Sequence, residues 1–118
     1  MNTRKAILTY MYAERIKSEL IIASNLLAAM DGFEGDKRLG AEKMMASFLE
    51  ALTGELRIAQ HVERSMNFIG AERKITEAIG KIGLNERSGI NQCISEAFSL
   101  VTTCSSGAMK VLMSQQLI

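Results

Sequence analysis

The sequence contains no proline and no tryptophan, and aromatic residues make up only 5% of its 118 positions. Without proline, nothing in the chain forces a helix to kink or stop, so long helices are permitted throughout. The formal net charge is +1, which provides no long-range field to attract nucleic acid or an anionic membrane. Tyr10 and Tyr12 are the only aromatic residues interleaved with basic ones, and the sequence pI is near 7.8. Specific nucleic-acid binders usually show a basic face and a high pI, so we expect no nucleic-acid partner.

Cysteine is also scarce, and its placement excludes a disulfide within the chain. Cys93 and Cys104 lie three helical turns apart, about 16 Å along one helix, whereas a disulfide requires Cα atoms within about 7 Å. Neither cysteine has a histidine or a basic residue within a helical turn that would favour the reactive thiolate. The longest uncharged run, Ala97 to Met109, falls short of the roughly 20 residues of a membrane span. With no signal-peptide pattern at the N-terminus, we expect a cytoplasmic protein.

The most regular pattern lies between Glu86 and Gln116. Apolar residues recur there at alternating spacings of four and three, which places them on one stripe of a helix; these are Ile90, Ile94, Ala97, Val101, Cys104, Ala108 and Val111. After Arg87 the stretch carries only two charges, Glu96 and Lys110. A helix without a charged face is normally surrounded by other helices, so we expect this helix to be central.

A first helix is predicted from Thr3, as its cap, to the Asp31-Gly32 stop. Its apolar stripe consists of Ala6, Ala13, Ile16, Leu20, Ala23, Leu27 and Met30. The segment from Leu20 to Met30 contains no charge. We therefore expect the second half of this helix to be more deeply buried than the first.

A second helix is predicted from about Asp36 or Leu39 to Ile69, with Gly70 as the break. Its apolar stripe consists of Ala41, Met45, Phe48, Leu52, Leu56, Ala59, Val62, Met66 and Ile69. Gly54, inside this helix, indicates close approach of another backbone. A shorter helix follows, with Ala71, Ile75, Ala78 and Ile82 on one face and Gly83 at its end. Asn85 is the expected cap of the last helix.

These patterns predict one all-α domain over residues 1–118, an elongated up-and-down bundle of three long helices and one short helix. A helix of about thirty residues spans about 45 Å, and a helix of about twelve residues covers only part of the fourth side. We expect the open side to be completed by a second copy, because two-fold dimers are the commonest assembly. The residues expected at the core or the dimer interface are Leu20, Ala23 and Leu27 together with the seven stripe residues of the last helix. The small residues of 102–108 allow close packing, either within the chain or across the dimer.

His61 is the only histidine, and its helical neighbours provide no carboxylate for a metal site. The run from His61 to Gly70 resembles the phosphoacceptor segment of histidine phosphotransfer domains, which are four-helix bundles of similar size. Arg64 and Ser65 occupy positions at which that family has a lysine and a small residue, whereas Glu63 replaces an apolar one. The resemblance implies a signalling module with His61 as phosphoacceptor.

The glutamates lie on charged helix faces among basic residues, where solvation accounts for them. We therefore predict a non-enzymatic interaction or scaffold protein that forms a homodimer, without a cofactor or a metal. A different protein partner and the phosphotransfer role of His61 are the alternatives.

Overall fold

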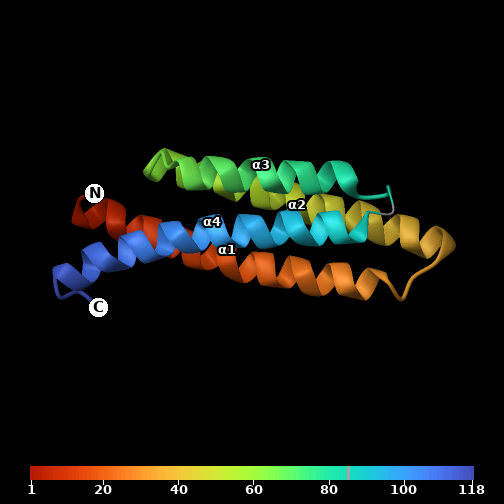
Figure 1. The fold of residues 1–118 in the computed structure, drawn as a ribbon, viewed down its shortest axis with the longest axis horizontal. Helices are drawn as coiled ribbons and strands as arrows, with labels where there is room; N and C mark the ends of the chain where they lie inside the picture. Colours follow the sequence, from red (N-terminus) through yellow and green to blue (C-terminus); the bar gives the residue numbers. More distant parts are fainter. Residues whose placement is uncertain (85) are drawn as a thin grey trace.

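The computed structural model describes residues 1–84 and 86–118, and these residues form an elongated, antiparallel bundle (Figure 1). The helices are α1 (Thr3–Met30), α2 (Gly35–Val62), α3 (Met66–Lys81) and α4 (Arg87–Ser114). Three of them have 28 residues and α3 has 16. The bundle measures 54 × 21 × 19 Å, so the predicted elongated all-α architecture is confirmed.

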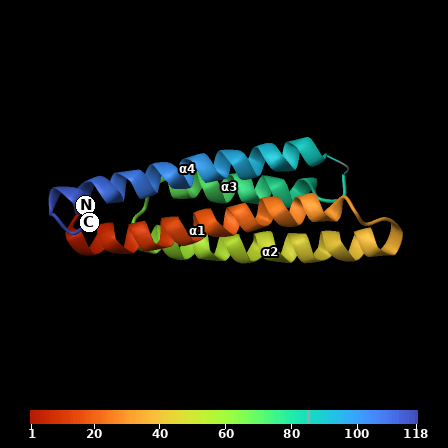
Figure 2. The same cartoon turned by 90° about the horizontal axis from the view of Figure 1, so that it is seen from below.

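The helices are arranged as a ring in which each one packs against two neighbours (Figures 1 and 2). Helix α1 contacts α2 and α4, and α3 contacts the same two helices from the opposite side. The core is formed by residues from all four helices, and its largest fully buried side chains are Phe68, Ile16, Leu20, Leu27, Leu49, Leu52, Leu56, Ile75 and Val101. The short α3 therefore contributes one of the largest core side chains, Phe68.

The start of α1 is capped one residue earlier than the sequence predicts. Asn2 has an extended backbone, and its side-chain oxygen accepts a hydrogen bond from the Lys5 amide at 2.8 Å. Thr3, the predicted cap, is the first residue of the helix. Asparagine is a better cap than threonine, which accounts for the difference. The predicted cap of the last helix, Asn85, lies outside the described residues.

The break between α2 and α3 lies at residues 63–65, not at Gly70. Glu63 is extended, and the Ser65 hydroxyl caps α3 by accepting a hydrogen bond from the Asn67 amide at 3.1 Å. Met66 and Ile69 therefore belong to α3, which is longer than the predicted twelve residues. Serine is a favoured helix cap, whereas a single glycine inside a helix is tolerated at a cost of about 1 kcal/mol.

The close approach predicted at Gly54 is found at Gly70 instead. A Cβ atom placed on Gly54 would have no heavy atom within 4 Å, so this prediction is wrong. A Cβ atom on Gly70 would lie 3.2 Å from the Cδ1 atom of Leu100. The glycine in α3 thus allows this helix to pack closely against α4.

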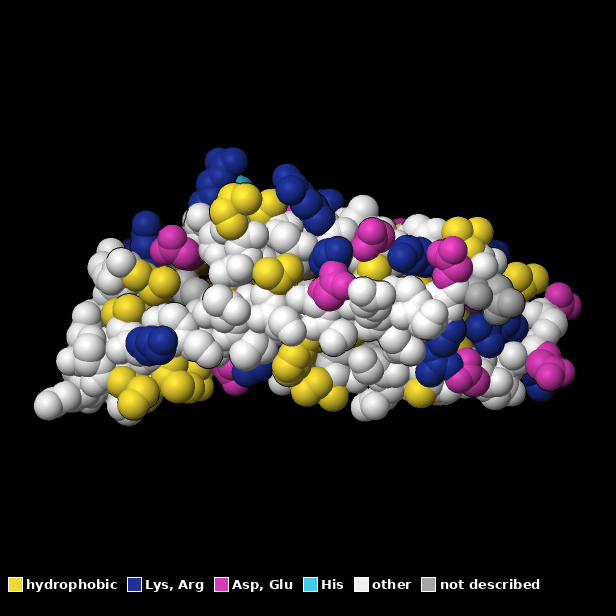
Figure 3. All heavy atoms as spheres, in the orientation of Figure 1, with side chains coloured by type: hydrophobic (Ala, Val, Ile, Leu, Met, Phe, Trp, Pro, Cys, Tyr) yellow, Lys and Arg dark blue, Asp and Glu magenta, His cyan; other side chains and the backbone are white. Residues whose placement is uncertain are grey.

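Helix α4 buries its predicted stripe but is not central. All of the stripe residues are buried except Val111, which is half-buried. The opposite side of α4 is exposed and consists mainly of Ser88, Asn91, Gln92, Ser95, Ser99, Thr103, Ser106 and Gly107. In Figure 3 the band of surface over α4 is largely free of hydrophobic and charged side chains. Small polar side chains face water here in place of charged ones, so the absence of charge does not imply burial on every side.

The second half of α1 is also more exposed than the sequence predicts. Only one stripe of it, Leu20, Ala23, Leu27 and Met30, faces the core. Ile21, Ile22 and Leu26 are 53%, 47% and 41% exposed. The ring places α2 and α4 on two sides of α1 and leaves its outer side uncovered, and Figure 3 shows hydrophobic side chains along the edge over α1. The predicted deeper burial of this half is therefore wrong.

Candidate functional site

Two grooves flank the exposed side chains Ile21, Ile22 and Leu26, named here the α1 ridge, with Ile21 in the wall of one groove and Leu26 in the wall of the other. The α1–α4 groove has a volume of about 260 Å³ and is lined by Leu20, Ile21, Ser24, Asn25, Asn91, Ile94, Ser95 and Phe98. Its walls carry apolar side chains together with hydroxyl and amide groups. None of the described residues that line it is charged.

The α1–α2 groove lies on the other side of the ridge, beside the connection between the two helices. Its volume is about 250 Å³, and all of its lining residues are apolar: Leu26, Ala29, Met30, Phe33, Ala41, Met44, Met45 and Phe48. Three of these are methionines, whose flexible side chains adapt to varied apolar partners. Met44 is 76% exposed. This surface is therefore suited to bind an apolar partner.

The register between α1 and α2 fixes which residues face each other along this groove. Arg15 of α1 forms an ion pair with Glu55 of α2. Because the helices are antiparallel and lie side by side (Figure 2), each step forward along α1 matches a step back along α2. This register places Leu26 level with Met44, and both residues line the groove.

A charged cluster closes the α1–α2 groove at the end far from the connection. Arg15 bonds Glu19 at 3.1 Å within α1 and also reaches Glu55 across the helix pair. The second carboxylate oxygen of Glu55 is buried and has no partner among the described residues. Burial, followed by the nearby carboxylate of Glu19, raises the pKa of Glu55 to about 7. Near neutral pH, Glu55 is thus in part a neutral acid.

We expect Glu55→Gln to stabilise the protein at pH 8 by about 1–2 kcal/mol and to have little effect at pH 4.5. The carboxyl group titrates near 4.5 when unperturbed and near 7 when folded. Between these values the folded state binds more protons, so stability falls as the pH rises. Glutamine has nearly the shape of the carboxyl group, and it carries no charge to be desolvated. Thermal unfolding at the two pH values measures the difference.

The matched control for this measurement is Glu50→Gln, which removes a carboxylate from an exposed position of the same helix. Surface substitutions of this kind change stability by less than about 0.5 kcal/mol. An equal gain from both variants would show that net charge, not the Glu19–Glu55 pair, is responsible.

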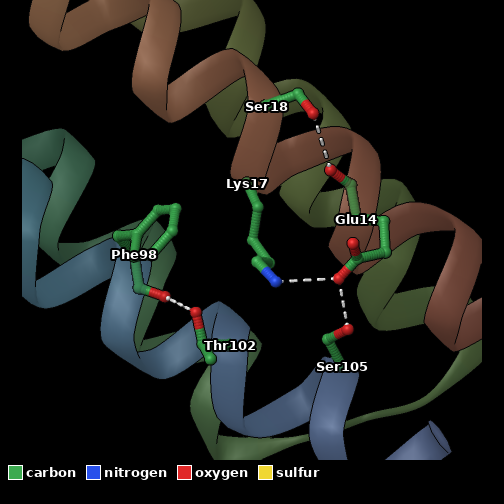
Figure 4. A network of polar contacts seen from close by, with 6 residues as sticks. All are labelled: Glu14, Lys17, Ser18, Phe98, Thr102 and Ser105. Carbon is green, nitrogen blue, oxygen red and sulfur yellow. Dashed lines mark hydrogen bonds and ion pairs between the residues drawn. The ribbon is translucent and has the colours of Figure 1, made fainter.

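A polar network joins α1 to α4 halfway along the bundle (Figure 4). Glu14 accepts hydrogen bonds from the buried Ser105 hydroxyl and from Lys17, whose ammonium group is 2.9 Å away. These contacts lower the pKa of Glu14, the Ser105 bond most. The Lys17 ammonium group also lies 5.9 Å from the centre of the Phe98 ring. The Glu14 carboxylate is thus ionised and bonded to two donors, and its bond to Ser105 links α1 to α4.

His61 is exposed and is the next-to-last residue of α2. It lines a hollow of about 320 Å³ together with Asn2, Arg4, Lys5, Leu8 and Val62. Arg64 and Ser65, which carry the phosphotransfer resemblance, follow the end of α2. The helical spacing on which that resemblance depends is therefore absent on the C-terminal side of His61.

Both cysteines are buried, free thiols. Cys93 donates a hydrogen bond to Glu77 at 2.9 Å, and burial, followed by that carboxylate, raises the pKa of Cys93 to about 11. Burial likewise raises the pKa of Cys104, whose sulfur lies 3.4 Å from the Ser65 hydroxyl. Both groups are thus neutral thiols at physiological pH and are poor nucleophiles.

No group of three or more His, Cys, Asp or Glu side chains in 1–84 and 86–118 is arranged to hold a metal ion. Within the same residues, no helix has the length and apolarity that crossing a membrane requires.

Most residues that the sequence assigns to a core or interface stripe lie in the core of the single chain. The buried ones are Leu20, Ala23, Leu27, Ile90, Ile94, Ala97, Val101, Cys104 and Ala108. In the run 102–108, Cys104, Ser105 and Ala108 face inward, and Thr103, Ser106 and Gly107 face outward. The α1–α2 groove is absent from the sequence prediction. The sequence feature that corresponds to this groove is the charge-free segment 20–30, for which the sequence predicts deep burial.

Comparison of the chain with protein-family models, curated proteins and solved structures gives no match.

Proposed function

We propose that this chain is a non-enzymatic interaction protein that binds a second copy of itself through the second half of α1. The observation that carries this proposal is the exposed α1 ridge with its two uncharged grooves. Soluble monomers rarely leave contiguous apolar patches larger than a few hundred Å² in water.

The exposed apolar area is sufficient for a specific contact. Ile21, Ile22, Leu26, Phe33 and Met44 are 41–76% exposed, which amounts to on the order of 500 Å² at about 200 Å² for a large side chain. A standard interface takes about 800 Å² from each partner, the remainder being a polar rim. At about 25 cal/mol per Å², this burial supports association even after its entropic cost.

Sedimentation or light scattering tests the proposal directly. At micromolar concentration we expect a mass of 26.0 kDa, which is twice the 13.0 kDa of one chain. Ile22→Glu, at a position that is 47% exposed, should leave the fold intact and give a monomer, because it places an unpaired charge in the contact. Glu50→Gln is the control that should leave the mass unchanged. A wild-type mass of one chain across a wide concentration range, with a cooperative melt, would overturn the proposal.

The competing hypothesis is phosphotransfer by His61, which is supported by its exposure beside Arg4 and Lys5. We favour self-association because α2 ends at Val62, so Arg64 and Ser65 are not on the helical face of His61. Incubation with acetyl phosphate separates the two hypotheses. An acid-labile label that is lost in His61→Gln would favour the relay.

A further inference from the structure

We propose that the contact between copies is the α1–α2 groove, in an antiparallel two-fold arrangement that sets Lys37 of each copy against the Glu19–Glu55 pair of the other. This inference rests on the proposed self-association and identifies its surface and geometry. It is carried by the composition of the groove and by the placement of charges at its two ends.

The two grooves beside the α1 ridge differ in chemistry. Four of the residues that line the α1–α4 groove are Ser or Asn, which water solvates well, whereas every residue that lines the α1–α2 groove is apolar. The gain from removing a surface from water scales with its apolar area. The α1–α2 groove therefore gains more from being covered.

Charges of opposite sign lie at the two ends of this groove. Lys37 is on the same face of α2 as Ala41, Met44 and Phe48, because these positions follow at helical spacings of four, three and four. It is exposed and has no ion pair with any described residue. At the far end, Glu19 and Glu55 share the single cation Arg15. On the face that lines the groove, one end thus carries the positive charge of Lys37, whereas Asp36 lies on another face of the first turn of α2 and Glu34 caps that helix. The other end has an excess of negative charge once Glu55 is ionised.

The two charged ends are equally far from the level of Leu26 and Met44. The register sets these two groove residues level with each other, and we place the middle of the contact there. Glu19 lies seven residues before Leu26, and Lys37 lies seven residues before Met44. Because the helices run in opposite directions, these residues are about 10 Å from the middle on opposite sides.

A two-fold axis through the middle, perpendicular to the helices and within the interface, exchanges the two ends. It lays the Lys37 end of each copy over the Glu19–Glu55 end of its partner and packs the apolar middle against itself, as an isologous contact requires. A parallel arrangement would set Lys37 level with Lys37, and like charges oppose such pairing. The charge pattern therefore selects the antiparallel arrangement.

A small amphiphile or one helix of another protein could also fill an apolar groove. Neither occupant needs opposite charges at equal distances from the middle, whereas a second copy of this chain satisfies both ends at once. The reciprocal contact also provides the test.

The test uses two charge reversals, Lys37→Glu and Glu19→Lys. Each variant alone places like charges at both ends of its dimer, and we expect dissociation to become easier by about tenfold or more at low salt. A mixture of the two variants restores an opposite-charge pair at both ends, so mixed dimers should form with close to wild-type affinity. Lys43→Glu, at an exposed position on another face of α2, is the control and should dimerise normally. Sedimentation of the separate and mixed proteins measures each affinity, and circular dichroism confirms that each variant is folded.

A cross-link gives a measurement that is independent of charge. Met44 lies on the proposed axis and is 76% exposed, so Met44→Cys should form an intermolecular disulfide on mild oxidation, and Lys43→Cys should not. Two results together would overturn this geometry and leave self-association standing. They are wild-type dimer affinity in both charge-reversal variants and the absence of a cross-link through Met44→Cys. A wild-type chain that is monomeric at every concentration would overturn both proposals.

Discussion

Val101→Asp is expected to unfold the protein or to prevent its accumulation as a folded chain. Val101 is fully buried in the middle of the apolar stripe of α4. Helix α4 packs against both α1 and α3, so a carboxylate at this position is surrounded by apolar side chains. Burying an unpaired charge costs several kcal/mol, a large part of the 5–15 kcal/mol by which domains are typically stable. Circular dichroism and thermal melting of the purified variant measure the loss.

The matched control is Ser99→Asp, which introduces the same side chain two residues earlier on the exposed side of α4. We expect it to melt within a few degrees of the wild type, because surface substitutions change stability by less than about 0.5 kcal/mol. Wild-type melting of Val101→Asp would mean that this stripe is accessible to water and that the packing described for α4 is wrong.

Phe68→Ala is expected to cost about 3–5 kcal/mol. Phe68 is fully buried and lies near the start of α3. Truncation removes apolar surface from the core and leaves a cavity that the surrounding helices fill only in part. Urea unfolding, analysed for the midpoint and for the slope, gives the change in free energy.

Phe33→Ala is the control, since Phe33 is 44% exposed at the edge of the α1–α2 groove. It should lower the stability of the isolated chain by less than about 1.5 kcal/mol, because much of its side chain is already in water. A loss as large as that of Phe68→Ala would indicate that the groove is closed by another surface under the conditions of measurement.

The regular spacing of apolar residues was sufficient to predict the buried stripes of α1 and α4 and the elongated bundle. Periodicity shows which face of a helix turns inward, and Ile94 and Val101 are buried as it predicts. It does not show how many neighbours a helix has. The exposed Ser95 and Ser99 account for the wrong prediction that α4 is central. Absence of charge does not imply burial, because small hydroxyl side chains are also stable in water.

The end of α2 could not be predicted from periodicity because the apolar spacing continues through Met66 and Ile69 across the break. What ends the helix is local, namely the extended backbone at Glu63 and the side-chain cap at Ser65. Gly70 was the stronger signal in the sequence, but in the fold it serves contact with Leu100. A capping residue inside an unbroken apolar pattern is easily overlooked.

The candidate interface was predicted in part. The uncharged segment from Leu20 to Met30 correctly drew attention to the second half of α1. Its pairing with Met44 and Phe48 was not foreseen, because the lateral position of α2 depends on tertiary register. Only that register places the opposite charges of Glu19 and Lys37 at opposite ends of the groove.

The two thiols lie beneath opposite ends of α3. Cys104 lies against Ser65 at its cap, and Cys93 bonds Glu77 in its last turns. Because both are buried, their reaction with a thiol reagent is slow and becomes faster when the helix lifts away from α4. Equal rates at the two sulfurs would mean that α3 detaches as a unit, and unequal rates would identify the end that frays first. The two native cysteines thus report the rate at which the shortest helix opens, without an introduced label.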